Sequence, residues 1–146
     1  MATSMYKLNQ KSAAIEFYNK AIKSDSTFGG PYYNRGVDYF SDKQYAKALS
    51  DFEKYIGFDS TNGVVFHTMA SCLKRLERYD EAVMFYGKAI EFYPSERELA
   101  IYYFDRGLSN YLIGNLQDSK SDIQNAQNKG YDIPDFLVNE FDLQTE

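Results

Sequence analysis

The chain has no tryptophan and holds only one cysteine, one histidine and three prolines among its 146 residues. A single cysteine, Cys72, cannot close an intramolecular disulfide, and its place beside Leu73 in a helical pattern favours a small buried hydrophobe over a reactive thiol. With His67 as the only histidine, neither an ordinary zinc site nor a Ser-His or Cys-His catalytic centre can be assembled. We therefore expect no metal, no cofactor and no enzymatic activity.

Long apolar runs and basic stripes are missing as well. No stretch approaches the roughly 18 apolar residues of a membrane span, and the start "MATSMYKLNQ" lacks the apolar core of a signal peptide. A soluble protein is expected, without membrane insertion and cytoplasmic rather than exported, unless a targeting segment belongs to a longer parent chain. The net charge of −5 argues against a nucleic-acid partner. The last sixteen residues carry five acids and no Lys or Arg, which fits a solvated acidic helix or an acidic partner-binding tail.

The sequence does contain an internal repeat. The segment "AIEFYNKAIKSDST" from Ala14 returns as "ALSDFEKYIGFDST" from Ala48 and as "AVMFYGKAIEFYPS" from Ala82, at intervals of 34 residues. A weaker copy, "SKSDIQNAQNKGYD", begins at Ser119. Apolar residues recur at helical spacing in each copy, and another helical stretch precedes each copy, so the repeating unit is two helices. The breaks between the paired helices are predicted around Asp42, Glu77 and Gly114.

A 34-residue helix-turn-helix unit with small and aromatic residues at fixed slots resembles the tetratricopeptide repeat, and the resemblance covers nearly the whole chain. In the second unit the family's slots hold Tyr32, Gly36, Tyr39, Ala48, Phe52, Tyr55 and Ser60. In the third unit they hold Phe66, Ala70, Leu73, Ala82, Tyr86, Ala89 and Pro94. In the fourth they hold Tyr103, Gly107, Asn110, Ser119, Ile123, Ala126 and Tyr131, with an asparagine in the tyrosine slot.

The resemblance implies an all-α, right-handed superhelical solenoid of antiparallel helix pairs. About three and a half repeats are expected, followed by a C-terminal capping helix. We expect a single domain over residues 1–146. Its parts are a partial repeat at 2–26, repeats at 29–62, 63–96 and 100–131, and a capping helix with tail at 133–146.

Both ends of the array carry a specific expectation. The first unit has its second helix from about Gln10 to Ser24 but only the last half of its first helix. This leaves Ile15, Tyr18 and Ile22 partly uncovered, and a homo-oligomer formed through this end is the hypothesis that follows. In the capping helix, the apolar residues Phe136, Leu137 and Phe141 are expected on one side, with acids on the outer face.

Small residues mark the contact between the two helices of a unit. Glycine inside a helix costs about 1 kcal/mol relative to alanine, so a close approach of the paired helices is the expected reason for its presence. The structural residues of this kind are Gly36, Ala48, Ala70, Ala82 and Gly107.

Arginine precedes two of these glycines. Arg35 and Arg106 occupy equivalent slots, and the second helices of the same units carry Asp51 and Asp122 at a matched position. The third unit has Met69 and Phe85 in the same two slots. The two slots hold opposite charges in two of the units and two apolar residues in the third. We therefore infer that the slots touch and that Arg35–Asp51 and Arg106–Asp122 are interhelical ion pairs. A structural role is favoured, with a catalytic or ligand-binding role as the alternative.

The concave face that such arrays form is the candidate binding site, because the first helices of successive units line it. The residues expected to face this groove are Tyr33, Asn34, Val37, Phe40, His67, Thr68, Ser71, Lys74, Phe104, Asp105, Leu108 and Tyr111. This lining suits an extended peptide or a partner helix with apolar anchors. An ordinary solvated face is the alternative. The family subgroup that grips chaperone tails with lysine, asparagine and arginine is disfavoured. In units two to four those slots hold Tyr33, Val37, Thr68, Ile101 and Asp105, and in units one to three only Asn34 matches.

These patterns predict a non-catalytic scaffold that binds a protein or peptide. A self-associating or spacer module, cut from a larger repeat protein and without a groove ligand, is the competing interpretation.

Overall fold

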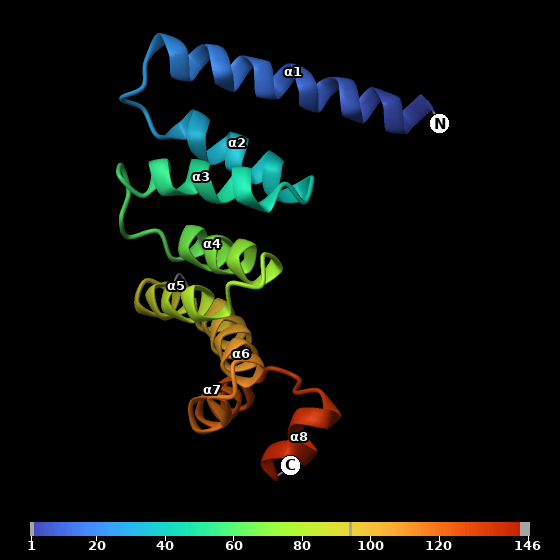
Figure 1. The fold of residues 1–146 in the computed structure, drawn as a ribbon, viewed down its shortest axis with the longest axis vertical. Coiled ribbons are helices and arrows are strands. Elements are labelled where there is room, and N and C mark those ends of the chain that lie inside the picture. The colour runs from blue at the N-terminus through green and yellow to red at the C-terminus, as the bar shows by residue number, and fades with distance from the viewer. Residues whose placement is uncertain (1, 94, 144–146) are drawn as a thin grey trace. The chain divides into compact units, whose positions relative to one another are not determined.

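The computed structural model describes residues 2–93 and 95–143, and every regular element in those residues is an α-helix. The chain divides between Thr61 and Asn62 into two compact units. Unit 1 holds α1 (Ala2–Ser24), α2 (Gly30–Ser41) and α3 (Tyr45–Tyr55). Unit 2 holds α4 (Gly63–Arg75), α5 (Tyr79–Glu91), α6 (Glu96–Leu112), α7 (Leu116–Asn128) and α8 (Asp135–Phe141) (Figure 1).

The helices pair as the repeat predicts. Contacts join α2 with α3, α4 with α5 and α6 with α7, and each pair is closed by a turn of three residues that makes its helices antiparallel. The predicted breaks around Asp42, Glu77 and Gly114 are confirmed. Equivalent turn residues have positive φ angles, 59° at Lys43, 60° at Glu77 and 81° at Gly114, and they reverse the chain in the same way in all three pairs.

Helix starts follow ordinary capping chemistry. The Asn62 side chain accepts a hydrogen bond from the Val65 amide at 3.2 Å, which satisfies one open N–H group at the start of α4. Ser95 caps α6, and Glu96 and Glu98 in its first turn lie where the helix dipole favours negative charge. These signals position α4 and α6, each of which is the first helix of a helix pair in unit 2.

The helical glycines Gly36 and Gly107 make room for side chains of the paired helix. A Cβ atom at Gly36 would lie 2.9 Å from the ring of Phe52, which is buried in the core of unit 1. A Cβ atom at Gly107 would lie 3.0 Å from atoms of Asp122 and Ile123. Glycine therefore serves close packing here, and at Gly36 the close neighbour is an aromatic ring.

Helix α1 departs from the expected half-helix and turn. It runs without a break from Ala2 to Ser24, so residues 2–9 continue the second helix of the partial unit and do not form a separate first helix. Ile15, Tyr18 and Ile22 are half-buried, while Phe17 is 67% exposed. Two polar contacts hold α1 to α2 and to the turn that follows it. Lys11 of α1 pairs with Asp42 in the turn, and Arg35 Nη1 of α2 donates to Asn19 Oδ1 of α1 at 2.5 Å.

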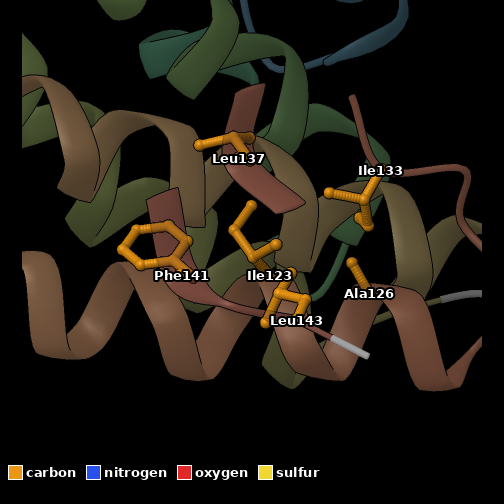
Figure 2. Close-up of a cluster of buried hydrophobic side chains, with 6 residues drawn as sticks. All are labelled: Ile123, Ala126, Ile133, Leu137, Phe141 and Leu143. Carbon is orange, nitrogen blue, oxygen red and sulfur yellow. The ribbon is translucent and has the colours of Figure 1, made fainter. Parts of the chain in front are cut away.

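The C-terminal end of unit 2 has its own apolar cluster (Figure 2). It consists of Ile123, Ala126, Ile133, Leu137, Phe141 and Leu143. Leu137 and Phe141 of α8 point into this cluster as expected, but Phe136 does not share their side, because it is 55% exposed. Figure 2 shows the α8 side chains facing those of α7. The short α8 helix therefore covers the last helix pair.

Candidate functional site

Three charged or titratable side chains meet on the first helices of unit 2. Asp105 of α6 binds both of its partners on α4: its Oδ2 lies 2.8 Å from His67 Nε2, and its Oδ1 accepts from Lys74 Nζ at 2.5 Å. We call His67, Lys74 and Asp105 the His67 cluster. Its side chains are 22%, 20% and 17% exposed in that order, so they reach solvent while being partly shielded from it. All three were predicted to line the groove.

Aromatic rings surround the His67 cluster. The imidazole of His67 stacks on Tyr102, with ring centroids 4.5 Å apart and an interplanar angle of 19°, and lies 5.4 Å from the ring of Tyr86. Lys74 Nζ lies 5.6 Å from the Tyr86 ring centroid, which is cation–π distance. The hydroxyls of Tyr86 and Ser71 are 3.2 Å apart. Polar groups thus sit on an aromatic floor, a combination that gives both hydrogen bonds and apolar contact to a ligand.

The charges of the cluster follow from its geometry. Burial opposes ionisation of Asp105, but the hydrogen bond from His67 and the charge of Lys74 outweigh it and lower the pKa of Asp105. Burial, followed by the charge of Asp105, raises the pKa of the Tyr86 hydroxyl, and burial raises that of Tyr102 to about 12. Asp105 is therefore an anion at neutral pH, whereas the phenols of Tyr86 and Tyr102 are neutral.

Replacing Asp105 by asparagine is expected to weaken unit 2 in a pH-dependent way. Because the pKa of Asp105 is lower in the folded state, its stabilisation is complete above the ordinary aspartate value near 3.9 and is lost as the pH falls toward the folded pKa. We expect Asp105→Asn to cost about 1–2 kcal/mol at pH 7. The difference from the parent protein should shrink in strong acid.

Urea unfolding at pH 7 and at about pH 3 measures this difference. Asp132→Asn, at an exposed carboxylate of the same unit, is the matched control and should change stability little at either pH. An Asp105→Asn penalty that is equal at both pH values would contradict the assigned role of the carboxylate.

The two ion pairs inferred from the repeat comparison are present. Arg35 donates to Asp51 from Nε at 2.8 Å and from Nη2 at 2.6 Å. Arg106 donates to Asp122 from Nε at 2.8 Å and from Nη2 at 2.7 Å. Both are bidentate, and both carboxylates are nearly buried. Because each guanidinium is bound by a carboxylate of the paired helix, the geometry suits a packing role better than a catalytic one.

Predicted groove residues of unit 1 divide between surface and packing. On α2, Asn34 is exposed and Val37 is 42% exposed. Tyr33 instead packs against Phe52 and Tyr55 of α3, with ring centroids 6.3 and 5.1 Å away, and Phe40 packs against Tyr45. The rings of Tyr33 and Phe40 are half-buried and serve mainly to pack α2 against α3.

The far end of α6 is covered by the chain itself. Phe104 stacks on Tyr131 with centroids 4.3 Å apart, and Tyr111 contacts Phe136 and Phe141 of α8 at 6.4 and 6.0 Å. Phe104 and Tyr111 pack against the apolar cluster of Figure 2. Leu108 is half-buried on the same helix. The open part of the site in unit 2 is therefore the His67 cluster with its neighbours Thr68 and Ser71.

Tyr102 was missed by the sequence reasoning. It is nearly buried beneath His67, and it lies one residue before the aromatic slot of the fourth unit, Tyr103. Its position three residues before Asp105, on the same side of a helix, is the signal that could have revealed it.

The structure also bears on chemistry. Within residues 2–93 and 95–143, no three His, Cys, Asp or Glu side chains gather closely enough to hold a metal ion. Cys72 is buried, and burial raises the pKa of its thiol to about 12, which keeps it protonated and unreactive at neutral pH. Among the described residues, no helix has both the length and the apolar character needed to cross a membrane.

Comparisons with known proteins agree with the repeat. The family model described as tetratricopeptide repeat matches residues 5–28 and 65–96. The TPR repeat-containing protein MJ1428 of Methanocaldococcus jannaschii is 26% identical over 132 residues, which are 84% of this chain and 23% of that protein. Human tetratricopeptide repeat protein 16 is 23% identical over 129 residues, 84% of this chain and 14% of that protein. The chain thus spans a quarter or less of the length of these curated relatives.

Solved structures share the fold. A crystal structure of YrrB, described as a TPR protein with an unusual peptide-binding site, aligns with a TM-score of 0.76 and 26% identity over 88% of this chain and 65% of that one. A crystal structure of MamA aligns with a TM-score of 0.77 and 16% identity over 87% of this chain and 72% of that one. The predicted class, an all-α solenoid of antiparallel helix pairs, is confirmed by these alignments.

Proposed function

Because the chain belongs to the tetratricopeptide repeat family, a family of generally non-catalytic interaction modules, we propose that it binds a peptide or helix of a partner protein on its first helices. The observation that carries this proposal is the His67 cluster on its aromatic floor, formed by α4 and α6. YrrB, which is described as having an unusual peptide-binding site, supports a ligand of the same kind. No catalytic role is proposed for any residue.

The chemistry of the cluster describes the ligand in outline. Lys74 and His67 are already bonded to Asp105, so a partner meets a nearly neutral surface and no free basic clamp. Backbone amides and carbonyls of an extended peptide can hydrogen-bond to the half-buried Ser71, His67 and Asp105. The neighbouring Tyr102 ring offers apolar area to one side chain of that peptide.

A displayed peptide library selected on the parent protein supplies the ligand, and calorimetry with surface variants tests the site. Thr68→Arg in unit 2 and Val37→Arg in unit 1 place a long cation on each candidate face without removing a core contact. We expect Thr68→Arg to weaken binding of the selected peptide at least tenfold, or about 1.4 kcal/mol. Val37→Arg reports whether α2 takes part as well.

Met84→Arg is the matched control, because it adds the same charge outside the proposed site. Met84 is 67% exposed on α5, the second helix of its pair. Its binding should equal that of the parent protein. Equal weakening by Met84→Arg and Thr68→Arg would indicate a general charge effect, and unchanged binding in Thr68→Arg would remove unit 2 from the site.

Self-association is a second candidate function, favoured by α1. This helix has 23 residues, its Phe17 ring is 67% exposed, and Ile15, Tyr18 and Ile22 are only half-buried. A second copy packing on this face would cover them. Analytical ultracentrifugation of the parent protein and of Phe17→Glu tests the idea: a dimer that dissociates in the variant supports it, and a monomer at all concentrations contradicts it.

A further inference from the structure

Helix α1 has nearly the same sequence as α5. The segment "AIEFYNKAI" from Ala14 and the segment "AVMFYGKAI" from Ala82 are identical at six of nine positions. The shared residues are two alanines, a Phe-Tyr pair, a lysine and an isoleucine. The segments of α3 and α7 that start at Ala48 and Ser119 keep only three and one of the nine. The surroundings of α5 therefore indicate what the side chains of α1 can bind.

Helix α4 covers one face of α5. The ring centroid of Phe85 lies 6.3 Å from that of Phe66 on α4, and Lys88 Nζ lies 5.5 Å from the Phe66 centroid. On the same face of α5, residues at helical spacing are fully buried, namely Ala82, Tyr86 and Ala89. A complete helix pair therefore shields these alanine and aromatic side chains from solvent.

The corresponding face of α1 is open. Phe17 takes the position of Phe85 and is 67% exposed, and Lys20 takes the position of Lys88 and is also exposed. The residues in the positions of the buried α5 residues are only half-buried, namely Ala14, Tyr18 and Ala21. Within unit 1, α2 contacts α1 as α6 contacts α5, and α3 pairs with α2 (Figure 1). No described helix of this unit therefore takes the place that α4 has on α5.

Neither residues 2–9 nor a second copy provides the missing helix. Helix α1 stays helical through Asn9, the position of the turn residues Lys43 and Glu77, so residues 2–9 continue along its axis and do not fold back. In a second copy, the described first helices α2, α4 and α6 are each packed on the second helix of their own pair. The α1 helix of that copy carries the face of a second helix and not that of a first helix.

We propose that α1 binds an amphipathic helix of a partner protein, which lies antiparallel to α1 in the place that α4 has on α5. The buried stripe of α4 describes the chemistry of this helix and consists, at helical spacing, of Phe66, Met69, Ala70 and Leu73. The partner helix needs an aromatic residue, a long apolar residue, a small residue and a leucine in that order. The small residue allows the two helices to approach closely, and the long apolar residue covers Phe17.

The charges near the end of α1 add a further requirement. Gly63 starts α4 beside the end of α5, because a Cβ atom there would lie 2.0 Å from the Phe92 carbonyl oxygen. The partner helix would likewise start beside the last turn of α1, where Lys20 and Lys23 are exposed, whereas α5 has Glu91 in the position of Lys23. An acid in the first turn of the partner helix is attracted by these lysines and by its own helix dipole. Because α4 has no acid in its first turn, this charge distinguishes the partner from α4.

The test is an amide NMR titration of the parent protein with a synthetic peptide of residues 62–76 that carries Val64→Glu and Cys72→Ser. Val64 is 43% exposed, so glutamate adds the acid outside the buried stripe, and the serine prevents a disulfide with the protein. We expect the amides around Phe17 to shift saturably, with a Kd of about 0.1–1 mM. A matched peptide that also carries Met69→Glu should leave these signals in place, because a charged side chain cannot cover the Phe17 ring.

Two variants of the protein locate the binding face. Phe17→Glu changes an exposed side chain and should weaken peptide binding about tenfold or more, whereas Phe136→Glu, at a ring that is 55% exposed on α8, adds the same charge elsewhere and should not. Lys23→Glu should weaken binding of the acidic peptide about threefold. It should have less effect on a peptide that keeps Val64.

Three results would overturn the proposal. They are equal binding of the two matched peptides, shifts centred on α5 in place of α1, and undiminished binding by Phe17→Glu. Sedimentation decides against a second copy: a dimer that Phe17→Glu dissociates, together with no peptide shift on α1, would assign this face to self-association and overturn the proposal. Thr68→Arg should bind the peptide as the parent protein does, so this proposal and the one at the His67 cluster can fail separately.

Discussion

Replacing Gly63 by alanine is expected to destabilise unit 2 by about 3 kcal/mol or more. Gly63 is the buried first residue of α4, and a Cβ atom there would lie 2.0 Å from the carbonyl oxygen of Phe92, 2.7 Å from its carbonyl carbon and 3.2 Å from the Ala89 oxygen. These are backbone atoms at the end of α5, which cannot rotate aside as a flexible side chain can. The start of α4 must therefore move away from α5.

Urea unfolding measures this effect, and Gly87→Ala is the matched control. Gly87 lies inside α5, and its added Cβ would meet only Arg106 Nη1 at 3.6 Å, which is an ordinary contact. Alanine there should stabilise by about 0.5–1 kcal/mol through helix propensity. A Gly63→Ala protein as stable as the parent would show that the α4–α5 contact is looser than described.

Truncating Asp122 to alanine is expected to cost about 3 kcal/mol, the second large effect. The carboxylate accepts two hydrogen bonds from Arg106 and one from Asn110, and all three donors lose their acceptor together. The guanidinium stays half-buried and loses its hydrogen-bonded counter-charge, although the charge of Asp118 still acts on it. Chemical denaturation of the purified variant measures the loss.

The helix pair α4–α5 supplies the control for this prediction, because Met69 and Phe85 occupy the same two slots there. The double variant Arg106→Met, Asp122→Phe copies that apolar solution and should recover most of the lost stability. A loss below about 1 kcal/mol in Asp122→Ala would place this pair with weak surface ion pairs. A double variant that stays as unstable as Asp122→Ala would show that the two slots are not interchangeable between units.

The sequence predicts the helix pairs well because their signal is repeated. The 34-residue period locates the breaks near Asp42, Glu77 and Gly114, and each of them is a real turn in the structure. Comparison between the repeats also pairs Arg35 with Asp51, since a charged slot next to an apolar one would be costly, and the structure contains this pair. Covariation inside one chain takes the place of an alignment here.

The end of the array that begins with α1 is predicted less well. Asn9 stands 34 residues before Lys43, in the slot that turns the later pairs, yet α1 passes through it as helix. The period marks equivalent positions but carries no information on whether a turn is stabilised by packing.

Side-chain direction is the second limit. The helical count places Tyr33, Phe104 and Tyr111 near the groove, but their rings turn to neighbours within their own units. Phe104 stacks on Tyr131, which fills the last slot of the fourth unit, and Tyr111 contacts α8, which lies outside the repeat slots. The polar residues His67, Lys74 and Asp105 are placed together, although their mutual bonds could not be derived from spacing alone.

The measurement that tests the proposed binding face most directly is paramagnetic NMR with a spin-labelled peptide from the library selection. We expect signal loss to centre on amides of α4 and α6 around His67 and Asp105, and to be absent in Thr68→Arg at the same peptide concentration. Signal loss centred on α5 and α7, or spread evenly over unit 2, would contradict binding at the first helices.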